Sequence, residues 1–348
     1  MKKVLFTLSL CLLAIACDYS NNENPETGIG TYILNNGSWG DNNSCIGVYK
    51  VQDKSYTPNA FNSANGFRLG DLAQDILVVN EEVYIAVYGS QTIFVTDLSL
   101  KVKNQINVDK NGVRLSPRYL TASKDRVFVS YYEGFVGEIN PKDYSVKVTE
   151  VGQNPEGLAV AGSNLYVANS GGLSYPVYDN TISVVSLGTF KETKRITVNP
   201  NPAKVVASSN GNYLYVFSYG DYDAAPALLQ LIDVASSDVS TLEYSSVSGI
   251  AKGNNDILYI LCGGYDQMWN PLPGTVFKHD MNKNKAMGSF ISDATEVPDA
   301  YSISATSDGY VYVGSSDYVN TGDMYVFSQD GKLHSRFDTQ GLNPVSAI

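Results

Sequence analysis

A short tripeptide of the form apolar–aromatic–apolar recurs along the chain. The six closest copies are Val83-Tyr84-Ile85, Val127-Phe128-Val129, Leu165-Tyr166-Val167, Leu214-Tyr215-Val216, Leu258-Tyr259-Ile260 and Val311-Tyr312-Val313. Successive copies are separated by 44, 38, 49, 44 and 53 residues, and Tyr32-Ile33-Leu34 is a looser seventh copy. A repeat of about 40 to 50 residues that is rich in short β-strands is typical of one blade of a β-propeller.

Further strands are predicted on both sides of each tripeptide. A loop rich in Gly, Asn or Tyr follows it, and then a second alternating strand such as Ile93–Asp97 or Leu229–Asp233. A third, more polar strand comes next, as in Lys194–Val198, and an inner strand that often begins near Pro precedes the tripeptide. Four short strands per repeat and no long helical pattern predict an all-β fold, a seven-bladed β-propeller.

The end of the chain indicates how the propeller closes. Asn343–Ile348 resembles the start of a blade, as at Asn154-Pro155 and Asn201-Pro202, whereas the first repeat, from about Thr31, lacks an inner strand. We therefore expect the C-terminal strand to join the first blade, which leaves no open sheet edge. The propeller is then a single domain over residues 31–348.

The first thirty residues have a different pattern. Residues 1–16 combine Lys2 and Lys3 with an apolar run too short to span a bilayer, which predicts a signal peptide. Leu13–Cys17 resembles a bacterial lipobox, so we expect a lipoprotein with its lipid on Cys17; the alternative is a plain secretory signal with an incidental Cys. Residues 17–30 would then be the lipidated cysteine and a flexible polar tether, which holds a soluble domain against a membrane.

Composition and charge exclude several classes of protein. The hydrophobic content of 43% is sufficient for a core, and the net charge of −11 would repel a phosphate backbone, which argues against nucleic-acid binding. Once Cys11 and Cys17 belong to the leader and the anchor, Cys45 and Cys262 remain, and both lie in or beside apolar strands. Buried free thiols are favoured over a disulfide, and the absence of a CxxC motif or a His/Cys cluster argues against a zinc site.

Aromatic residues gather in loops that a propeller places on one face. These are the loops between blades and the loops after each tripeptide strand. The candidate ligand-binding residues in them are Trp39, Phe67, Arg68, Tyr88, Arg118, Tyr119, Tyr131, Tyr132, Tyr175, Tyr178, Tyr219, Tyr222, Tyr265, Trp269 and Tyr318. Rings with Asn and Ser between them suit a large amphipathic ligand. The alternative, packing between blades, is expected for the strand residues Tyr84, Tyr166, Tyr215, Tyr259 and Tyr312.

Charged residues at the starts of the inner strands form a second, narrower set around the axial opening. Asp75, Arg118, Glu156, Lys204 and Asp299 would either hold an ion or a polar substituent, or be solvated charges of the rim.

The two histidines, His279 and His334, fall away from the aromatic loops, which argues against an enzyme that uses His. Loop carboxylates such as Glu133, Asp221 and Asp317 leave a carboxylate- or cation-dependent hydrolase or lyase open.

Tyr84–Asp97, Tyr166–Ser170 and Asn180–Val185 resemble the YVTN repeat of surface-layer-type propellers. Together with the lipobox and the aromatic face, the chain is similar to the cell-surface cobalamin-binding propeller lipoproteins of gut Bacteroidetes. This resemblance implies an outer-membrane, cell-surface location, a vitamin B12 ligand on the loop face, no catalytic cofactor, and transfer to a TonB-dependent outer-membrane transporter. Carbohydrate binding or cleavage, and a protein-interaction scaffold, are the alternative functions.

Overall fold

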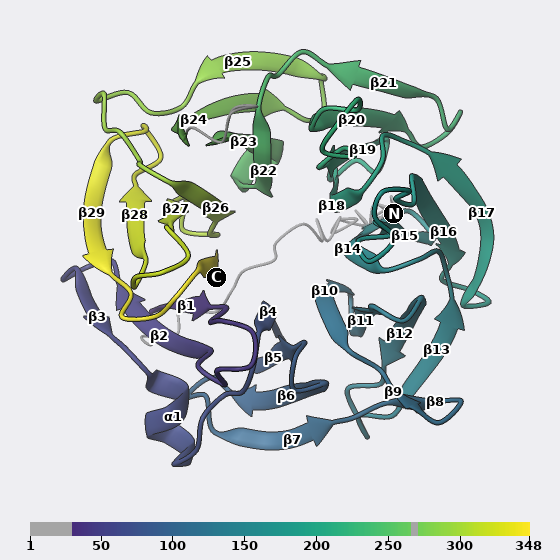
Figure 1. Ribbon diagram of the computed structural model, residues 1–348, viewed down its shortest axis with the longest axis horizontal. Helices are drawn as coiled ribbons and strands as arrows, with labels where there is room; N and C mark the ends of the chain where they lie inside the picture. The colour runs from purple at the N-terminus through teal and green to yellow at the C-terminus, as the bar shows by residue number, and fades with distance from the viewer. Residues whose placement is uncertain (1–29, 266–270) are drawn as a thin grey trace, which may run out of the picture.

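The protein forms seven four-stranded antiparallel sheets arranged as blades around a common axis, in a computed structural model that describes residues 30–265 and 271–348 (Figure 1). The all-β, seven-bladed propeller predicted from the repeats is confirmed. Each blade runs outward from an inner strand at the axis to an outer strand at the rim, in chain order except in the first blade.

The strands follow the predicted repeats closely. Blade 1 contains β1 (Thr31–Asn35), β2 (Cys45–Lys50), β3 (Ser55–Thr57) and β30 (Pro344–Ala347). Blade 2 contains β4 (Ala73–Val79), β5 (Glu82–Val87), β6 (Thr92–Asp97) and β7 (Val102–Ile106). Blade 3 contains β10 (Pro117–Ser123), β11 (Arg126–Tyr131), β12 (Phe135–Ile139) and β13 (Val146–Glu150). Blade 4 contains β14 (Pro155–Ala161), β15 (Asn164–Asn169), β16 (Thr181–Ser186) and β17 (Lys191–Thr197).

The last three blades have the same layout. Blade 5 contains β18 (Pro202–Ala207), β19 (Tyr213–Ser218), β20 (Leu228–Asp233) and β21 (Val239–Leu242). Blade 6 contains β22 (Val247–Lys252), β23 (Ile257–Tyr265), β24 (Pro271–Asp280) and β25 (Lys285–Ser289). Blade 7 contains β26 (Ala300–Ala305), β27 (Val311–Ser315), β28 (Asp323–Phe327) and β29 (Leu333–Asp338). Outside the blades lie α1 (Ala60–Asn65), the 3-10 turn η1 (Asn254–Asp256), and the hairpin of β8 (Asp109–Lys110) and β9 (Val113–Arg114).

The propeller is closed by its last strand. β30 pairs with β1 in antiparallel register, with Ile33 opposite Ala347. Backbone hydrogen bonds of 2.9 and 3.1 Å between Tyr32 and Ile348 extend the pairing by one residue. The predicted closure of the first blade by the C-terminal strand is therefore confirmed, and the edge of β1 is paired.

The inner strands begin with a repeated backbone turn. The residue before the strand has a positive φ at Asn154 (45°), Asn201 (57°) and Asn343 (57°), a conformation that Asn tolerates better than most residues. In blades 4 and 5 its carbonyl oxygen accepts a hydrogen bond from the residue that follows the second strand of the blade. Tyr88, Tyr132 and Tyr219 all follow the second strand of their blades and donate to the segment before the inner strand, so the fold places them equivalently on one face.

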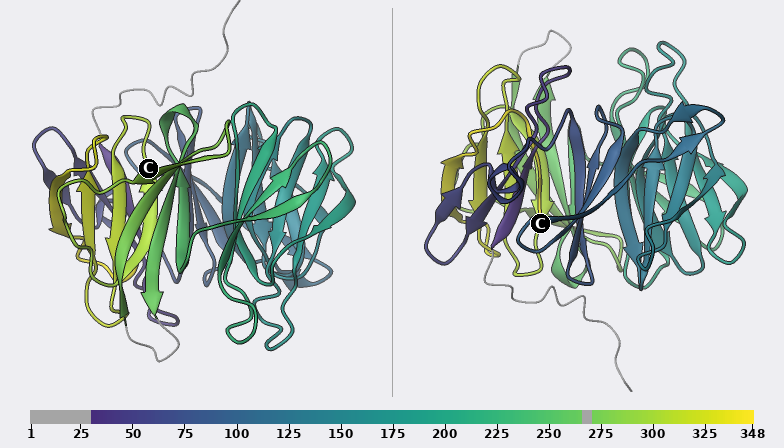
Figure 2. Two further views of the ribbon diagram at one scale, coloured as in Figure 1. Left: turned by 90° about the horizontal axis from the view of Figure 1, so that it is seen from above. Right: turned by 90° about the horizontal axis from the view of Figure 1, so that it is seen from below.

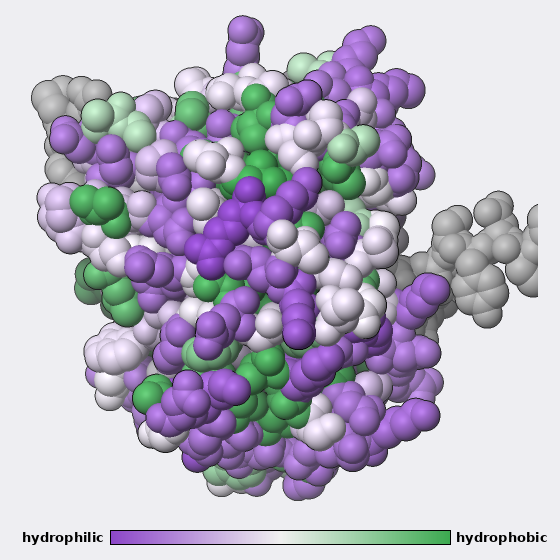
Figure 3. Space-filling view, turned by 90° about the vertical axis from the view of Figure 1, so that its right-hand side faces the viewer, coloured by the Kyte–Doolittle hydropathy of each residue, from purple (hydrophilic) through white to green (hydrophobic). Residues whose placement is uncertain are grey.

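The strand tyrosines pack the blades together, as expected. Tyr84, Tyr166, Tyr215, Tyr259 and Tyr312 are all at most 6% exposed. Cys45 and Cys262 are free and buried, and burial raises the pKa of each thiol to about 11. The outer strands are mostly polar, and the side of the molecule that carries β13 and β17 is predominantly hydrophilic (Figure 3).

The two faces of the propeller differ in which loops they carry. We call loop face the end that bears the loops between blades and the loops after β1, β5, β11, β15, β19 and β27; it is seen in profile in Figure 2. β1 runs toward this face, so Thr31 starts at the opposite face. His279 lies near the end of β24, also toward the opposite face, where its ring nitrogens contact Tyr244 and Asn284 at 3.0 Å. No helix in residues 30–265 and 271–348 has the length and apolar character needed to cross a bilayer.

Candidate functional site

An arginine clamped between two aromatic rings lies at the axial end of the loop face. Arg118 is the second residue of β10, and its guanidinium carbon is 4.8 Å from the ring centroid of Tyr88 and 4.7 Å from that of Tyr132. The two rings meet edge to face at 5.5 Å, and Trp39 continues the row with its centroid 5.9 Å from that of Tyr88. Tyr119 is a further ring beside Arg118, at 5.9 Å. The fold therefore brings together five of the candidate residues predicted from the sequence: Trp39, Tyr88, Arg118, Tyr119 and Tyr132.

Arg118 is also held by a carboxylate from the next blade. Its Nε and one terminal nitrogen donate to Glu156 over 2.9 and 2.7 Å, and the two side chains are only 16% and 9% exposed. Burial raises the pKa of Glu156, and the positive charge of Arg118 offsets part of that rise. The sequence predicted that the axial charges either hold an ion or a polar substituent, or are solvated at the rim. Arg118 and Glu156 do neither, because they pair with each other away from solvent.

A second aromatic row crosses blades 4 and 5. Ring centroids are 6.3 Å apart between Tyr175 and Tyr178, 6.0 Å between Tyr178 and Tyr222, and 6.4 Å between Tyr222 and Tyr219. Phe217 of β19 supports the inner end of the row, at 4.8 Å from Tyr219. Tyr175 is 74% exposed and Tyr222 65%, so these rings project into solvent although they contact one another. The four tyrosines of this row were all predicted from the sequence.

Blade 7 adds a pair of aromatic rings, Tyr301 and Tyr318, of which only Tyr318 was predicted from the sequence. Tyr318 stacks edge to face with Tyr301 at 5.4 Å, and burial raises the pKa of Tyr301 to about 12. Tyr301 was not predicted as a site residue. It is the second residue of β26, the same repeat position as Arg118 in β10 and Glu156 in β14, so that position was the signal that could have identified it.

Two further residues of opposite charge, Asp75 and Lys204, lie on the inner strands β4 and β18. Asp75 of β4 accepts a hydrogen bond from the backbone N–H of Leu120 at 2.8 Å. Burial raises its pKa to about 6, and the charge of Lys204 lowers it in part. Burial also lowers the pKa of Lys204, against the influence of Asp75. Asp299, the remaining member of the axial set, has a positive φ of 46° before β26 and accepts the Ser316 N–H through its backbone oxygen.

Three predicted residues lie outside these rows. Tyr131 is a correction: it is the last residue of β11, 1% exposed, and packs in the core between blades 2 and 3. Because side chains alternate along a strand, its neighbour Tyr132 faces outward while Tyr131 faces inward. Phe67 packs on Phe61 of α1 and on Phe94, at 5.6 and 6.1 Å, and Arg68 is exposed beside it.

Other predictions fall where the structure gives no description. Trp269, the lipid-bearing Cys17, the signal peptide and the tether up to residue 29 lie outside the described residues, and the side chain of Tyr265 is likewise not described. These assignments stay predictions.

Two of the candidate carboxylates on the loop face, Asp221 and Asp317, are engaged in their own turns. Asp221 accepts the backbone N–H groups of Asp223 and Ala225, at 2.9 and 2.8 Å. Asp317 accepts those of Val319 and Asn320, and these hydrogen bonds lower its pKa to about 2. A general acid needs a raised pKa, so neither group has that property. Within the described ranges, no three His, Cys, Asp or Glu side chains are grouped so as to hold a metal ion.

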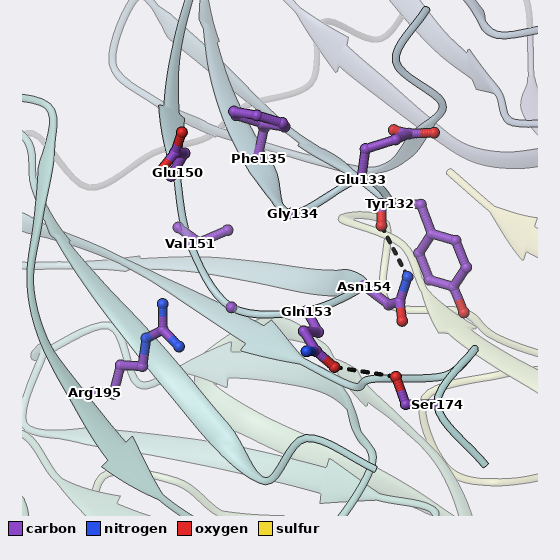
Figure 4. A pocket seen from close by; sticks show the side chains of 11 residues that line it. Tyr132, Glu133, Gly134, Phe135, Glu150, Val151, Gln153, Asn154, Ser174 and Arg195 are labelled. Carbon is purple, nitrogen blue, oxygen red and sulfur yellow. Dashed lines mark hydrogen bonds between the residues drawn. The ribbon is translucent and has the colours of Figure 1, made fainter. Parts of the chain in front are cut away.

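A hollow of about 470 Å³ opens between blades 3 and 4 beside the first aromatic row (Figure 4). It is lined by residues of the β11–β12 turn, the segment after β13, and blade 4; these are Tyr132–Phe135, Glu150–Asn154, Ser174 and Arg195. We call it the blade 3–4 groove. It shares only Tyr132 with the aromatic rows.

Comparison with known proteins supports the fold and nothing finer. No protein-family model matches the chain, and no curated protein matches it. Among solved structures, hydrazine synthase from Kuenenia stuttgartiensis is similar, with a TM-score of 0.60 and 16% sequence identity over 74% of this chain and 77% of that one. At this identity the likeness concerns the propeller architecture alone.

Proposed function

We propose that the protein is a lipid-anchored surface protein whose loop face binds a corrinoid such as cobalamin and delivers it to a TonB-dependent outer-membrane transporter. The observation that carries this proposal is the exposure of connected rings on one face. Trp39, Tyr175 and Tyr222 are 69%, 74% and 65% exposed, yet each contacts another ring of the face. Large exposed apolar surface of this kind marks a binding site.

The chemistry of the face suits a broad, flat ligand. A corrin ring is apolar over its faces and carries a fringe of amides. The aromatic rows offer apolar area from side chains with few rotatable bonds, which lowers the entropy lost on binding. Hydroxyls of Tyr175, Tyr178 and Tyr222 lie at the tips of these rings and are able to pair with amide groups.

The direction of the first strand supports a surface role. Thr31 starts β1 at the face opposite the aromatic rows. A lipid on Cys17 and a tether over residues 17–30 would attach the domain to the membrane through that opposite face. The aromatic rows would then point away from the bilayer, toward solutes.

Calorimetric titration with cyanocobalamin tests the proposal directly. We expect saturable binding of one ligand per chain, and a thermal unfolding midpoint that rises with ligand concentration, because the ligand binds only the folded state. Absence of both heat and stabilisation at saturating cyanocobalamin would overturn the corrinoid assignment.

A further inference from the structure

The blade 3–4 groove has the size of a small-molecule site and an interior that is already held in place. Its volume of about 470 Å³ lies within the range of about 300 to 1,000 Å³ found for such sites. Gln153 accepts a hydrogen bond from the Ser174 hydroxyl at 3.0 Å through Oε1 (Figure 4). Its backbone N–H donates to Asp179 at 3.1 Å. The position of Gln153 is thus fixed before any ligand binds.

Asn154 holds together two of the loops that line the groove. Its Nδ2 donates to the backbone oxygen of Tyr132 at 2.9 Å, and its Oδ1 accepts the N–H of Leu173 at 3.2 Å. Asn154 therefore joins the β11–β12 turn to the loop after β15. In contrast, the side-chain nitrogen of Gln153 has no hydrogen-bond partner among the described residues, so it is available to donate to a ligand.

The charges of the groove select against anions. Arg195 donates to Glu192 at 2.8 and 3.2 Å, so its charge is already compensated. Glu133 uses one oxygen to accept the Ser116 N–H at 2.8 Å and keeps the other, while Glu150 is exposed at the end of β13. Two carboxylates with one compensated guanidinium leave an excess of negative charge, which disfavours a phosphate or carboxylate ligand.

Taken together, these groups match a polyhydroxylated ligand. Carboxylates accept hydrogen bonds from hydroxyl groups, whereas amide and guanidinium nitrogens donate to hydroxyl and ring oxygens. The rings of Tyr132 and Phe135 at the same groove offer apolar area for the C–H face of a sugar. We infer that the blade 3–4 groove binds a neutral saccharide unit, either of a free oligosaccharide or of a surface glycan, at a site beside the aromatic rows, with which it shares only Tyr132.

The test uses the full chain and a defined panel of ligands. The probes are the neutral disaccharides maltose, cellobiose and N,N′-diacetylchitobiose, the amine glucosamine, the anion glucuronate, and a printed array of surface glycans, with binding to soluble probes followed by saturation-transfer NMR and calorimetry. We expect at least one neutral probe to bind. Glu150→Ala should weaken that binding about tenfold or more, the loss expected for a hydrogen bond to a charged group. Glu243→Ala is the matched control, because Glu243 is an exposed carboxylate just beyond the corresponding outer strand of blade 5.

The outcomes separate this inference from the corrinoid proposal. Cyanocobalamin affinity should be the same in the wild type and in Glu150→Ala, whose thermal midpoint should also be unchanged. Binding of a soluble disaccharide indicates a free oligosaccharide, and binding confined to the array indicates a surface glycan. No neutral binding in either format, binding of glucosamine or glucuronate alone, or equal binding by Glu150→Ala would overturn the saccharide site, whatever cyanocobalamin does.

Discussion

Arg118 and Glu156 join the inner strands of two neighbouring blades through two hydrogen bonds, of 2.9 and 2.7 Å, beside the aromatic row that contains Tyr88 and Tyr132. The same guanidinium packs against the rings of Tyr88 and Tyr132. One cation thus connects the packing around the axis to the orientation of two candidate ligand-binding rings. Stability and ligand binding are expected to depend on it together.

Arg118→Leu should be strongly destabilising. It leaves the Glu156 carboxylate buried without a partner, and removal of one partner of a buried pair typically lowers the free energy of unfolding by about 3 to 5 kcal/mol. Urea unfolding measures the loss. The double variant Arg118→Leu/Glu156→Leu should recover most of it, since two apolar side chains leave no buried charge. A double variant as unstable as Arg118→Leu would show that the arginine acts through packing alone.

Tyr175→Ala combined with Tyr222→Ala should weaken cyanocobalamin binding by at least about tenfold, because a few aromatic anchors that become buried in a complex carry most of the binding energy. The thermal midpoint should change little, as surface substitutions away from the core are usually within about 0.5 kcal/mol. Met287→Ala is the control, since Met287 is an exposed apolar residue (49%) on outer strand β25. Unchanged calorimetric affinity in the tyrosine variant would place the ligand elsewhere.

Gly157→Ala tests the close approach of two inner strands. A Cβ at Gly157 would lie 2.8 Å from both the carbonyl oxygen of Ala203 and the Cα of Lys204, which are backbone atoms of β18. Backbone cannot move aside as a side chain does, so we expect a loss of about 1 to 3 kcal/mol, as for overpacked cores. Gly188→Ala is the matched control, because the nearest atom to its Cβ is 3.7 Å away. Equal denaturant midpoints for both variants would contradict so close a contact of β14 with β18.

The sequence predicted those features that repeat and missed those that depend on one strand end or one neighbour. The tripeptide period located the second strand of every blade, and the Asn-Pro pairs located β14, β18 and β30. Tyr131 was misplaced because it was grouped with the loop residue Tyr132, whereas it is the last residue of β11, as Val87 is of β5, and lies on the same side of the strand as Val129. Phe67 was likewise placed by the short helix α1, whose residues Ala60–Asn65 carry no clear periodic signal.

The pairing of the axial charges could not be predicted from the sequence either. Arg118 and Glu156 are 38 residues apart, and only the curvature of the ring brings their strands together. The inner-strand position identified them as facing the axis, but it did not say which charges would pair. Tyr301, in contrast, could have been predicted from the sequence. It occupies the same repeat position as Arg118 and Glu156, and its partner Tyr318 was already in the predicted set.

Asp75 should make stability fall as the pH rises through the acidic range. Burial raises its pKa to about 6 from an ordinary value of 3.8, so between these values the folded protein binds more protons than the unfolded chain. The free energy of unfolding therefore decreases from about pH 4 to pH 6, and the decrease is complete above pH 6. A shift of about two pKa units sets an upper limit of about 3 kcal/mol on this change in the free energy of unfolding.

Asp75→Asn isolates this contribution. The amide oxygen is able to keep the hydrogen bond from Leu120, whereas the titrating group is gone. Urea unfolding at several pH values should show the wild type losing stability relative to the variant between pH 4 and pH 6. A stability difference that is constant across that range would show that Asp75 titrates normally.

Deletion of Val345–Ile348 should remove the closing strand and destabilise the whole domain. Ala347 is 4% exposed against β1, and Tyr32 exchanges two backbone hydrogen bonds with Ile348, so the deletion opens a sheet edge and uncovers the core between the first and last blades. The expected loss in the free energy of unfolding exceeds about 4 kcal/mol, more than most single substitutions cause, because a whole strand is removed. Circular dichroism during heating measures it, and Val345→Ala, which keeps the strand's backbone pairing, should lose much less. A deletion variant that unfolds at the wild-type temperature would mean that β30 closes the ring without stabilising it, because the remaining blades would then hold the propeller by themselves.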